Sequence, residues 1–289
     1  YINFICHIGL FQVGLYGRNG LYMTIREPVA AGGFYKGVKN SLLEELEAMI
    51  PAIDDKIGAI GAVCPHAGYI YSGAVAGEVY GRLKSKETYI ILGPNHTGYG
   101  RRFALSNTRW QTPLGVVNID EELADAVERE TVLVVKDSAA HMFEHSIEVQ
   151  LPFIQKVAPQ AEILPMIIGQ GSLSELEEVA NAIAGAVKNT GRNVIIIASS
   201  DMSHYLPRKM AKIKDRLAID MVLALNAKGL LRVVEENDIS MCGYLPAAVM
   251  LMAAKMMGAV KGELIKYSDS GEITGSPSEV VGYAGIIVR

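Results

Sequence analysis

The chain has 289 residues, of which 50% are hydrophobic and 20% are charged, and its formal net charge at pH 7 is −4. This length and composition are typical of a globular protein that can bury a substantial core in one or two domains. The charge is weakly acidic, and Lys and Arg do not cluster among aromatic residues, which excludes the usual basic surface for nucleic acid. DNA and RNA are therefore not expected partners.

Cysteine usage indicates the compartment. Cys6, Cys64 and Cys242 lie far apart in the chain and form no CxxC pair. This argues against a disulfide scaffold or a zinc ribbon and is typical of a reducing environment. We therefore expect a cytoplasmic protein.

The first 22 residues, YINFICHIGLFQVGLYGRNGLY, are aromatic, apolar and interrupted by glycines, unlike the rest of the chain. They lack the cationic start and cleavage site of a signal peptide, and polar residues and glycines interrupt any run long enough for a membrane helix. The sequence from Met23 resembles a natural start, so residues 1–22 are interpreted as a non-native or disordered extension, with no membrane association expected. An intact mass of the native protein that begins at Tyr1 would contradict this interpretation.

From residue 40 onward, short β-type runs alternate with amphipathic helical patterns. Candidate strands occupy residues 57–64, 88–92, 163–168, 193–198 and 279–288. Candidate helices, with apolar residues at three- and four-residue spacing, occupy residues 72–84, 120–130, 144–157, 172–189, 209–225 and 245–258. The alternation predicts an α/β fold with a largely parallel central sheet. No Pro-, Gly- or Ser-rich linker divides the elements, which predicts a single domain over residues 23–289.

Two histidines occupy matching positions after predicted strands. His66 follows the first strand in GAVCPHAGYIYSG, and His96 follows the second in ILGPNHTGYG, thirty residues later. A parallel strand, helix and strand unit has about this length, so both histidines are expected at the carboxyl edge of the sheet, on strands that could be neighbours. That edge is where open α/β sheets bind ligands.

Two further segments point to the same edge. NVIIIASSDMSHY places Asp201 and His204 after another strand, and DISMCGYLPAAVML places Cys242 before a helix, whose N-terminal dipoles favour a thiolate. Each residue alone also has a structural interpretation. A loop histidine often only hydrogen-bonds, Cys242 could be a small buried apolar side chain, and Asp201 could cap a helix.

The stretch HMFEH, residues 141–145, matches the H-x-x-E-H signature of one class of zinc peptidases. That signature must lie within a continuous helix, whereas the apolar periodicity begins only at Ile147. We therefore favour the alternative, in which Glu144, His145 and Glu148 begin a helix whose polar first turn faces the same cleft. A serine hydrolase is also disfavoured, because SSDMSH lacks the G-x-S-x-G turn.

Seven motifs occur together in an order that resembles the Memo family, which is found from archaea and bacteria to animals. They are REPVAAGGFY, PHAGYIYSGAVAGEVY, ILGPNHTGYG, EHSIEVQLPFIQ, SSDMSHY, CGYLPAAVM and SGEITGSPSEVVGYAGIIV, and the resemblance covers residues 25–289. It implies a fold similar to that of the class III extradiol dioxygenases, a three-layer α/β/α sandwich with a mostly parallel, mixed central sheet.

The resemblance also implies roles for the residues at the sheet edge. His66, His96 and Cys242 match the family's metal-binding set, and Asp201 and His204 match residues that line the same cleft. The related dioxygenases hold non-haem iron on two histidines and a glutamate. A cysteine in place of the carboxylate counts against ring cleavage and makes iron or copper the expected metal, with zinc as the alternative.

The leading hypothesis is a metal-binding, dioxygenase-like oxidoreductase that acts on a small substrate. His204 would move protons, and Asp201 or His145 would orient the metal ligands. The alternative is a non-catalytic adaptor that binds a peptide or small ligand in the same cleft, as the signalling role of the animal relatives implies. A metal store with a closed coordination sphere is a third hypothesis. A homo-oligomer could form through the Met-rich helix at residues 245–258, although a core position is favoured for it.

Overall fold

The central strands are apolar on both faces. Successive side chains of a strand point to opposite sides of a sheet, so one strand contributes to two cores. In β3 (Thr88–Gly93), Tyr89 and Ile91 lie in one buried cluster, whereas Ile90 and Leu92 lie in the other. Such a sheet needs a layer of helices on each face.

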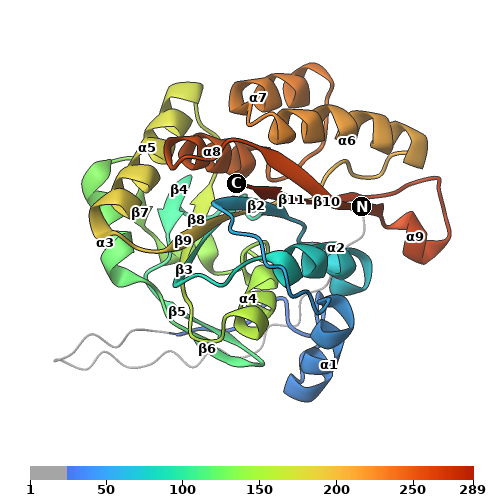
Figure 1. The fold of residues 1–289 in the computed structure, drawn as a ribbon, viewed down its shortest axis with the longest axis horizontal. Coiled ribbons are helices and arrows are strands. Elements are labelled where there is room, and N and C mark those ends of the chain that lie inside the picture. Colours follow the sequence, from blue (N-terminus) through green and yellow to red (C-terminus); the bar gives the residue numbers. More distant parts are fainter. Residues whose placement is uncertain (1–24) are drawn as a thin grey trace.

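The computed structural model describes residues 25–289 and contains a mixed eight-stranded sheet (Figure 1). In spatial order its strands are β10 (Gly262–Asp269), β11 (Gly282–Val288), β2 (Gly61–Cys64), β9 (Val194–Ser199), β3, β8 (Glu162–Ile168), β4 (Phe103–Leu105) and β7 (Val135–Lys136). The central strands β2, β9, β3 and β8 run parallel, whereas β11 and β4 pair antiparallel to β2 and β8. The predicted α/β class and the mostly parallel, mixed sheet are confirmed.

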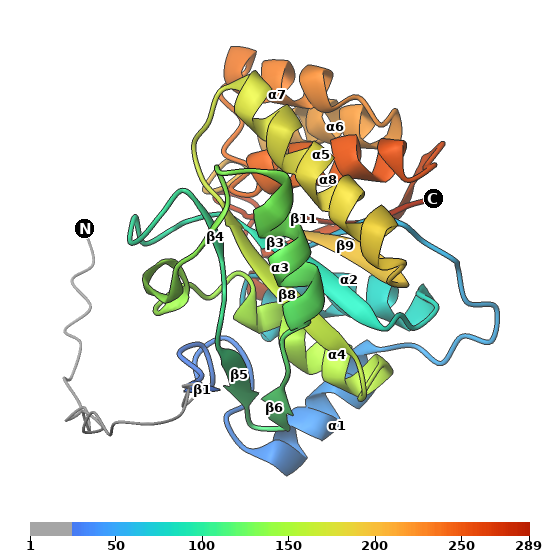
Figure 2. The ribbon, with the colours of Figure 1, turned by 90° about the vertical axis from the view of Figure 1, so that its left-hand side faces the viewer.

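Helices cover both faces of the sheet, which makes the three-layer α/β/α sandwich (Figures 1 and 2). One layer contains α3 (Glu121–Glu130), α5 (Leu173–Thr190), α6 (Arg208–Leu223), α7 (Ala227–Glu236) and α8 (Tyr244–Met256). The other contains α1 (Lys39–Met49), α2 (Tyr69–Arg82) and α4 (Leu151–Val157). The connections include the 3₁₀ turns η1 (Ser138–His141) and η2 (Glu148–Gln150), and α9 (Gly271–Thr274).

A second, three-stranded sheet lies near α1 and α4 in both views (Figures 1 and 2). It consists of β1 (Ile25–Arg26), β5 (Arg109–Thr112) and β6 (Gly115–Val117). This sheet, α1, α7 and the strands β4, β7 and β10 are absent from the predicted elements. The predicted extension at residues 1–22 lies outside the described residues. No helix between residues 25 and 289 is long and apolar enough to cross a membrane.

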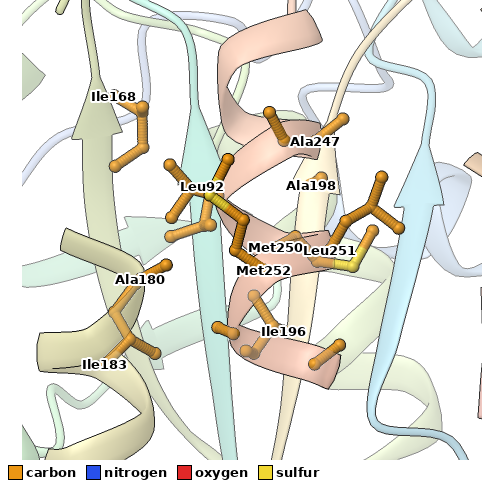
Figure 3. Close-up of a cluster of buried hydrophobic side chains, with 14 of the residues drawn as sticks. Leu92, Ile168, Ala180, Ile183, Ile196, Ala198, Ala247, Met250, Leu251 and Met252 are labelled. Atoms are coloured by element: carbon orange, nitrogen blue, oxygen red, sulfur yellow. The ribbon is translucent and has the colours of Figure 1, made fainter. Parts of the chain in front are cut away.

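Helix α8 packs against the centre of the sheet. Met250 and Leu251 are fully buried and lie beside Ile196 and Ala198 of β9 in the cluster of Figure 3. The helix is apolar on nearly every side because the sheet, α5 and α7 surround it. This places residues 245–254 of the Met-rich stretch in the core, as favoured from its sequence, whereas Met256 is half exposed.

The sheet order corrects one expectation about the two histidines. His66 follows β2 and His96 follows β3, but these strands are not neighbours, because β9 lies between them. All three strands are parallel, so their carboxyl ends still meet at one edge. The third strand therefore delivers Ser199 and Asp201 between the two histidines.

Candidate metal centre

Three imidazole rings meet at this edge of the sheet. His66 is buried and comes from the loop after β2, His96 comes from the loop after β3, and His145 lies in the turn before η2. The ring centroid of His66 lies 5.2 Å from that of His96 and 5.5 Å from that of His145. The rings of His96 and His145 are stacked, with their centroids 4.8 Å apart. One nitrogen from each ring lies within 4.8 Å of the other two, so the group could hold a metal ion.

Glu144 orients His96. Its buried carboxylate accepts a hydrogen bond from His96 Nδ1 at 2.9 Å and another from the His96 backbone N–H at 2.7 Å. Burial alone would raise the pKa of Glu144, but the hydrogen bonds and charge of His96, with help from the Ser146 N–H, lower this pKa to about 2. Glu144 is therefore ionised at neutral pH, and its bond to Nδ1 fixes the orientation of the His96 ring, as carboxylates commonly do for metal-binding histidines.

The surroundings of His66 and His145 favour their neutral forms. Burial lowers the pKa of His66 well below its usual value, and the nearby rings of His145 and His96 lower it further. Burial also lowers the pKa of His145, although the Glu144 charge opposes this effect. Neutral imidazole is the form that binds metals, so the lowered pKa values of His66 and His145 favour metal binding at neutral pH.

Cys242 lies beside this cluster, on the His66 side. Its Sγ is 3.3 Å from His66 Nε2 and accepts a hydrogen bond of 3.3 Å from the Asp201 backbone N–H. Without a metal, the surroundings of Cys242 oppose the thiolate expected from the sequence. Burial raises the pKa of the Cys242 thiol, and the Asp201 charge raises it further. Hydrogen bonds from the Asp201 N–H, the Ser200 hydroxyl and the Gly243 N–H only partly offset both effects.

Asp201 and His204 follow β9, as predicted, but they make different contacts. Asp201 Oδ1 accepts hydrogen bonds from the backbone N–H groups of His66 at 2.8 Å and Ala67 at 3.3 Å, so it holds the loop that carries His66. Burial raises the pKa of Asp201 to about 6. His204 is partly exposed, and its Nδ1 donates to the Ser240 carbonyl at 2.8 Å, which leaves Nε2 free.

The H-x-x-E-H motif is not a peptidase site in this fold. His141 ends the 3₁₀ turn η1, is buried, and donates from Nε2 to the Ala104 carbonyl at 3.2 Å. Only His145 of the motif belongs to the imidazole cluster. The helix expected from Glu144 is also wrong, because helical structure begins at Glu148 with η2 and continues as α4.

The aromatic side chain that packs on His145 was not among the predicted site residues. The centroid of Phe34 lies 4.5 Å from that of His145. The segment that carries Phe34 is tied to Glu148, whose buried carboxylate accepts hydrogen bonds from four donors: Arg26 Nη1, Val29 N, Ala30 N and Tyr35 Oη. These residues lie in the motif REPVAAGGFY, but only the folded chain connects that motif with Glu148.

The fold and the cluster together define the class, an α/β/α sandwich protein with a candidate metal centre at the carboxyl ends of its parallel strands. Within this class the chain belongs to the Memo family, because the family model described as Memo-like protein matches residues 26–287. It is 42% identical over 267 residues to a MEMO1 family protein of Methanosarcina barkeri, covering 92% of this chain and 100% of the relative. MEMO1 family proteins of Methanococcoides burtonii and Archaeoglobus fulgidus are 43% and 42% identical, each with 92% of this chain and 100% of the relative covered.

Proposed function

We propose that this protein binds a transition metal through His66, His96 and His145 and uses it for oxidoreductase chemistry on a small substrate. Iron or copper is the proposed metal, with zinc as the alternative. The observation that carries the proposal is the group of three imidazole nitrogens within 4.8 Å of one another.

The chemistry of the donor atoms supports this assignment. Two of the rings are held neutral by burial, and Glu144 places one negative charge beside the third. The 3.3 Å spacing of Cys242 Sγ and His66 Nε2 is close to that of two ligands on one ion, given metal bonds of about 2.0–2.3 Å. Imidazole and thiolate donors suit iron, copper or zinc better than magnesium or calcium.

A metal with three protein nitrogens would keep open positions, where it can polarise a substrate oxygen or activate O₂. The chain's own residues would then position these ligands and move protons. Glu144 orients His96, Asp201 holds the His66 loop, and His204 offers a free Nε2 as proton acceptor or donor.

Elemental analysis of the purified protein tests the metal assignment. We expect near-stoichiometric iron or copper in the wild type and none in the His66→Ala/His96→Ala double variant. His145→Ala should also lose metal, whereas Cys242→Ser should retain part of it with a changed preference. Absence of metal after anaerobic reconstitution would overturn the proposal. If His145→Ala kept all of its metal and Cys242→Ser lost all of it, the third ligand would be Cys242, as predicted from the sequence, and not His145.

Metal-dependent O₂ uptake tests the catalytic part. The assay would follow O₂ consumption by iron-loaded protein with a panel of small reduced substrates, beside the metal-free double variant. Uptake that appears with metal and disappears in His204→Ala supports the proposed proton carrier. A loaded protein without uptake on the panel would instead favour storage of the metal in a closed coordination sphere.

A second candidate is a binding site for a peptide or small apolar ligand. It is favoured by three exposed apolar side chains next to His96 and Glu144 in the chain: Tyr99 (59% exposed), Met142 (47%) and Phe143 (49%). The rings of Tyr99 and Phe143 lie 6.1 Å apart and offer a surface for an apolar group. Binding that persists after chelation and is lost in Phe143→Ala would support this candidate over metal-dependent chemistry.

A further inference from the structure

We propose that Ser199 is a positioning residue that fixes His66 as the Nδ1–H tautomer and thereby directs its Nε2 lone pair into the imidazole cluster. This inference rests on the proposed metal site for its function, but the tautomer itself is a property of the metal-free protein. Ser199 is the last residue of β9, and its hydroxyl is fully buried between the loops that carry His66 and His145.

The direction of each hydrogen bond follows from groups that can only accept. Gln150 has one side-chain atom 3.0 Å from the Pro65 carbonyl, and a carbonyl has no proton to give, so this atom must be the amide nitrogen. The same Gln150 Nε2 lies 2.8 Å from Ser199 Oγ and donates its second N–H to that oxygen. The amide oxygen is then free to accept from Tyr80 Oη at 3.0 Å, so all three bonds agree with one orientation.

The Ser199 hydroxyl has a single proton, and this proton is used in another hydrogen bond. It points at the Ser146 carbonyl, 2.7 Å away, which again can only accept. Ser199 Oγ therefore presents only lone pairs to its other two neighbours, the Gln150 amide and the ring of His66. Since His66 Nδ1 lies 3.0 Å from Ser199 Oγ, this nitrogen must carry the proton. His66 Nε2, 3.3 Å from Cys242 Sγ, is left with its lone pair.

The same hydroxyl also holds the backbone next to His145. Its bond to the Ser146 carbonyl fixes one side of this residue, and the Ser146 N–H donates to Glu144 Oε1 at 2.9 Å on the other. Glu144 in turn orients His96. Ser199 and Glu144 therefore hold the rings of His66 and His96, and the backbone next to His145, from outside the cluster, an arrangement typical of the residues that support metal ligands.

Long-range proton–nitrogen NMR of metal-free protein labelled with ¹⁵N-histidine tests the tautomer directly. The His66 signals are those absent in His66→Ala. We expect the wild-type proton on Nδ1, and in Ser199→Ala a shift of this proton to Nε2, where it faces the sulfur of Cys242. A wild-type proton on Nε2, or an unchanged tautomer in Ser199→Ala, would overturn the proposal, because the hydroxyl would then not decide it.

Competition titration with Zn²⁺ tests the consequence for the site. Ser199→Ala should weaken Zn²⁺ binding about 10- to 100-fold, the usual effect of removing a group that orients a ligand. Ser106→Ala is the matched control, because Ser106 is equally buried but accepts its hydrogen bond from Trp110. Ser199→Thr, which keeps a hydroxyl, should retain the Nδ1–H tautomer. Equal weakening in the Ser106 and Ser199 variants would reduce the role of Ser199 to packing and overturn the proposal.

The two proposals fail in different ways. A wild type that binds no metal but has the Nδ1–H tautomer contradicts the proposed function and supports the arrangement described for Ser199. A wild type that binds metal with the proton on Nε2 of free His66 contradicts only the role of Ser199.

Discussion

Residues of the same type have different roles around the cluster, and their surroundings decide which. His66 and His145 lie among other imidazoles and beside Glu144, whereas His141, four residues before His145, is buried with its ring edge-on to Trp110. The H-x-x-E-H motif would make His141 and His145 ligands of one metal ion. In the fold only His145 faces the site, because the chain between them is not a continuous helix.

The burial of His141 makes the protein sensitive to acid. Burial lowers the pKa of His141 to about 4 from 6.5, with Arg26 lowering it and the Ala104 carbonyl, Asp137 and Glu144 opposing the shift. As the pH falls, the unfolded chain takes up this proton before the folded chain does. The contribution of neutral His141 to the free energy of unfolding is therefore complete above pH 6.5 and is lost as the pH falls toward 4. The whole effect is worth about 3 kcal/mol.

The test is urea unfolding of wild type and His141→Gln at pH 7 and at pH 4.5. We expect the variant to lose less free energy of unfolding than the wild type between the two values, because its amide does not titrate. An equal loss in both proteins would show that other groups cause the acid sensitivity.

At the scale of elements, close packing of helices depends on small residues. A Cβ at Gly77 of α2 would overlap the backbone carbonyl of Met49 at the end of α1, whereas a Cβ at Gly73 would meet the flexible end of the Met49 side chain. Alanine favours a helix over glycine by about 1 kcal/mol at either position. We expect Gly77→Ala to lower the free energy of unfolding by about 1–2 kcal/mol, because backbone cannot move aside as cheaply as a thioether.

Gly73→Ala is the matched control on the same helix. Its stability in chemical denaturation should stay within about 1 kcal/mol of wild type or increase, as the helix propensity of alanine predicts. The packing argument fails if the two variants lose the same amount.

The N-terminal segment is attached to the rest of the fold by a buried ion pair. Arg26 Nη1 lies 2.6 Å from Glu148 Oε2, and both side chains are almost completely buried. Glu148→Ala would leave the Arg26 charge buried without its partner, which costs about 3–5 kcal/mol. The exposed pair of Lys156 and Glu47 is the comparison, and Glu47→Ala should cost less than about 1 kcal/mol. Thermal or urea unfolding measures both, and similar losses would contradict the structural role of the buried pair.

At the scale of the whole molecule, metal binding and folding are coupled, because the three histidines come from segments far apart in the chain and meet only in the folded state. A metal at about 100 times its Kd would stabilise the native state by about 2.7 kcal/mol. We expect the thermal midpoint to rise by about 5–10 °C on loading and to fall back on chelation. Differential scanning fluorimetry of wild type and the His66→Ala/His96→Ala variant checks this, and an equal rise in both would place the bound metal elsewhere.

Much of the architecture could be predicted from local patterns. The runs at residues 88–92, 163–168 and 193–198 became β3, β8 and β9 with shifts of a residue or so at their ends. The limits of α5 are also encoded locally, since Ser172 and Glu175 cap its start and Gly191, with φ at 67°, ends it. The short strands β4 to β7 were not predictable from such patterns, because pairing with distant strands stabilises them more than their own sequence does.

Local patterns were enough to predict an α/β protein in which His66, His96, Asp201 and His204 follow strands, because strand periodicity and strand ends are properties of short segments. The folded chain was needed to show that β9 separates β2 from β3, that His145 completes the imidazole cluster, and that burial raises the pKa of the Cys242 thiol. The physical reason is that sheet order, burial and the partner of each polar group depend on contacts between segments far apart in the chain, and no local pattern records these contacts.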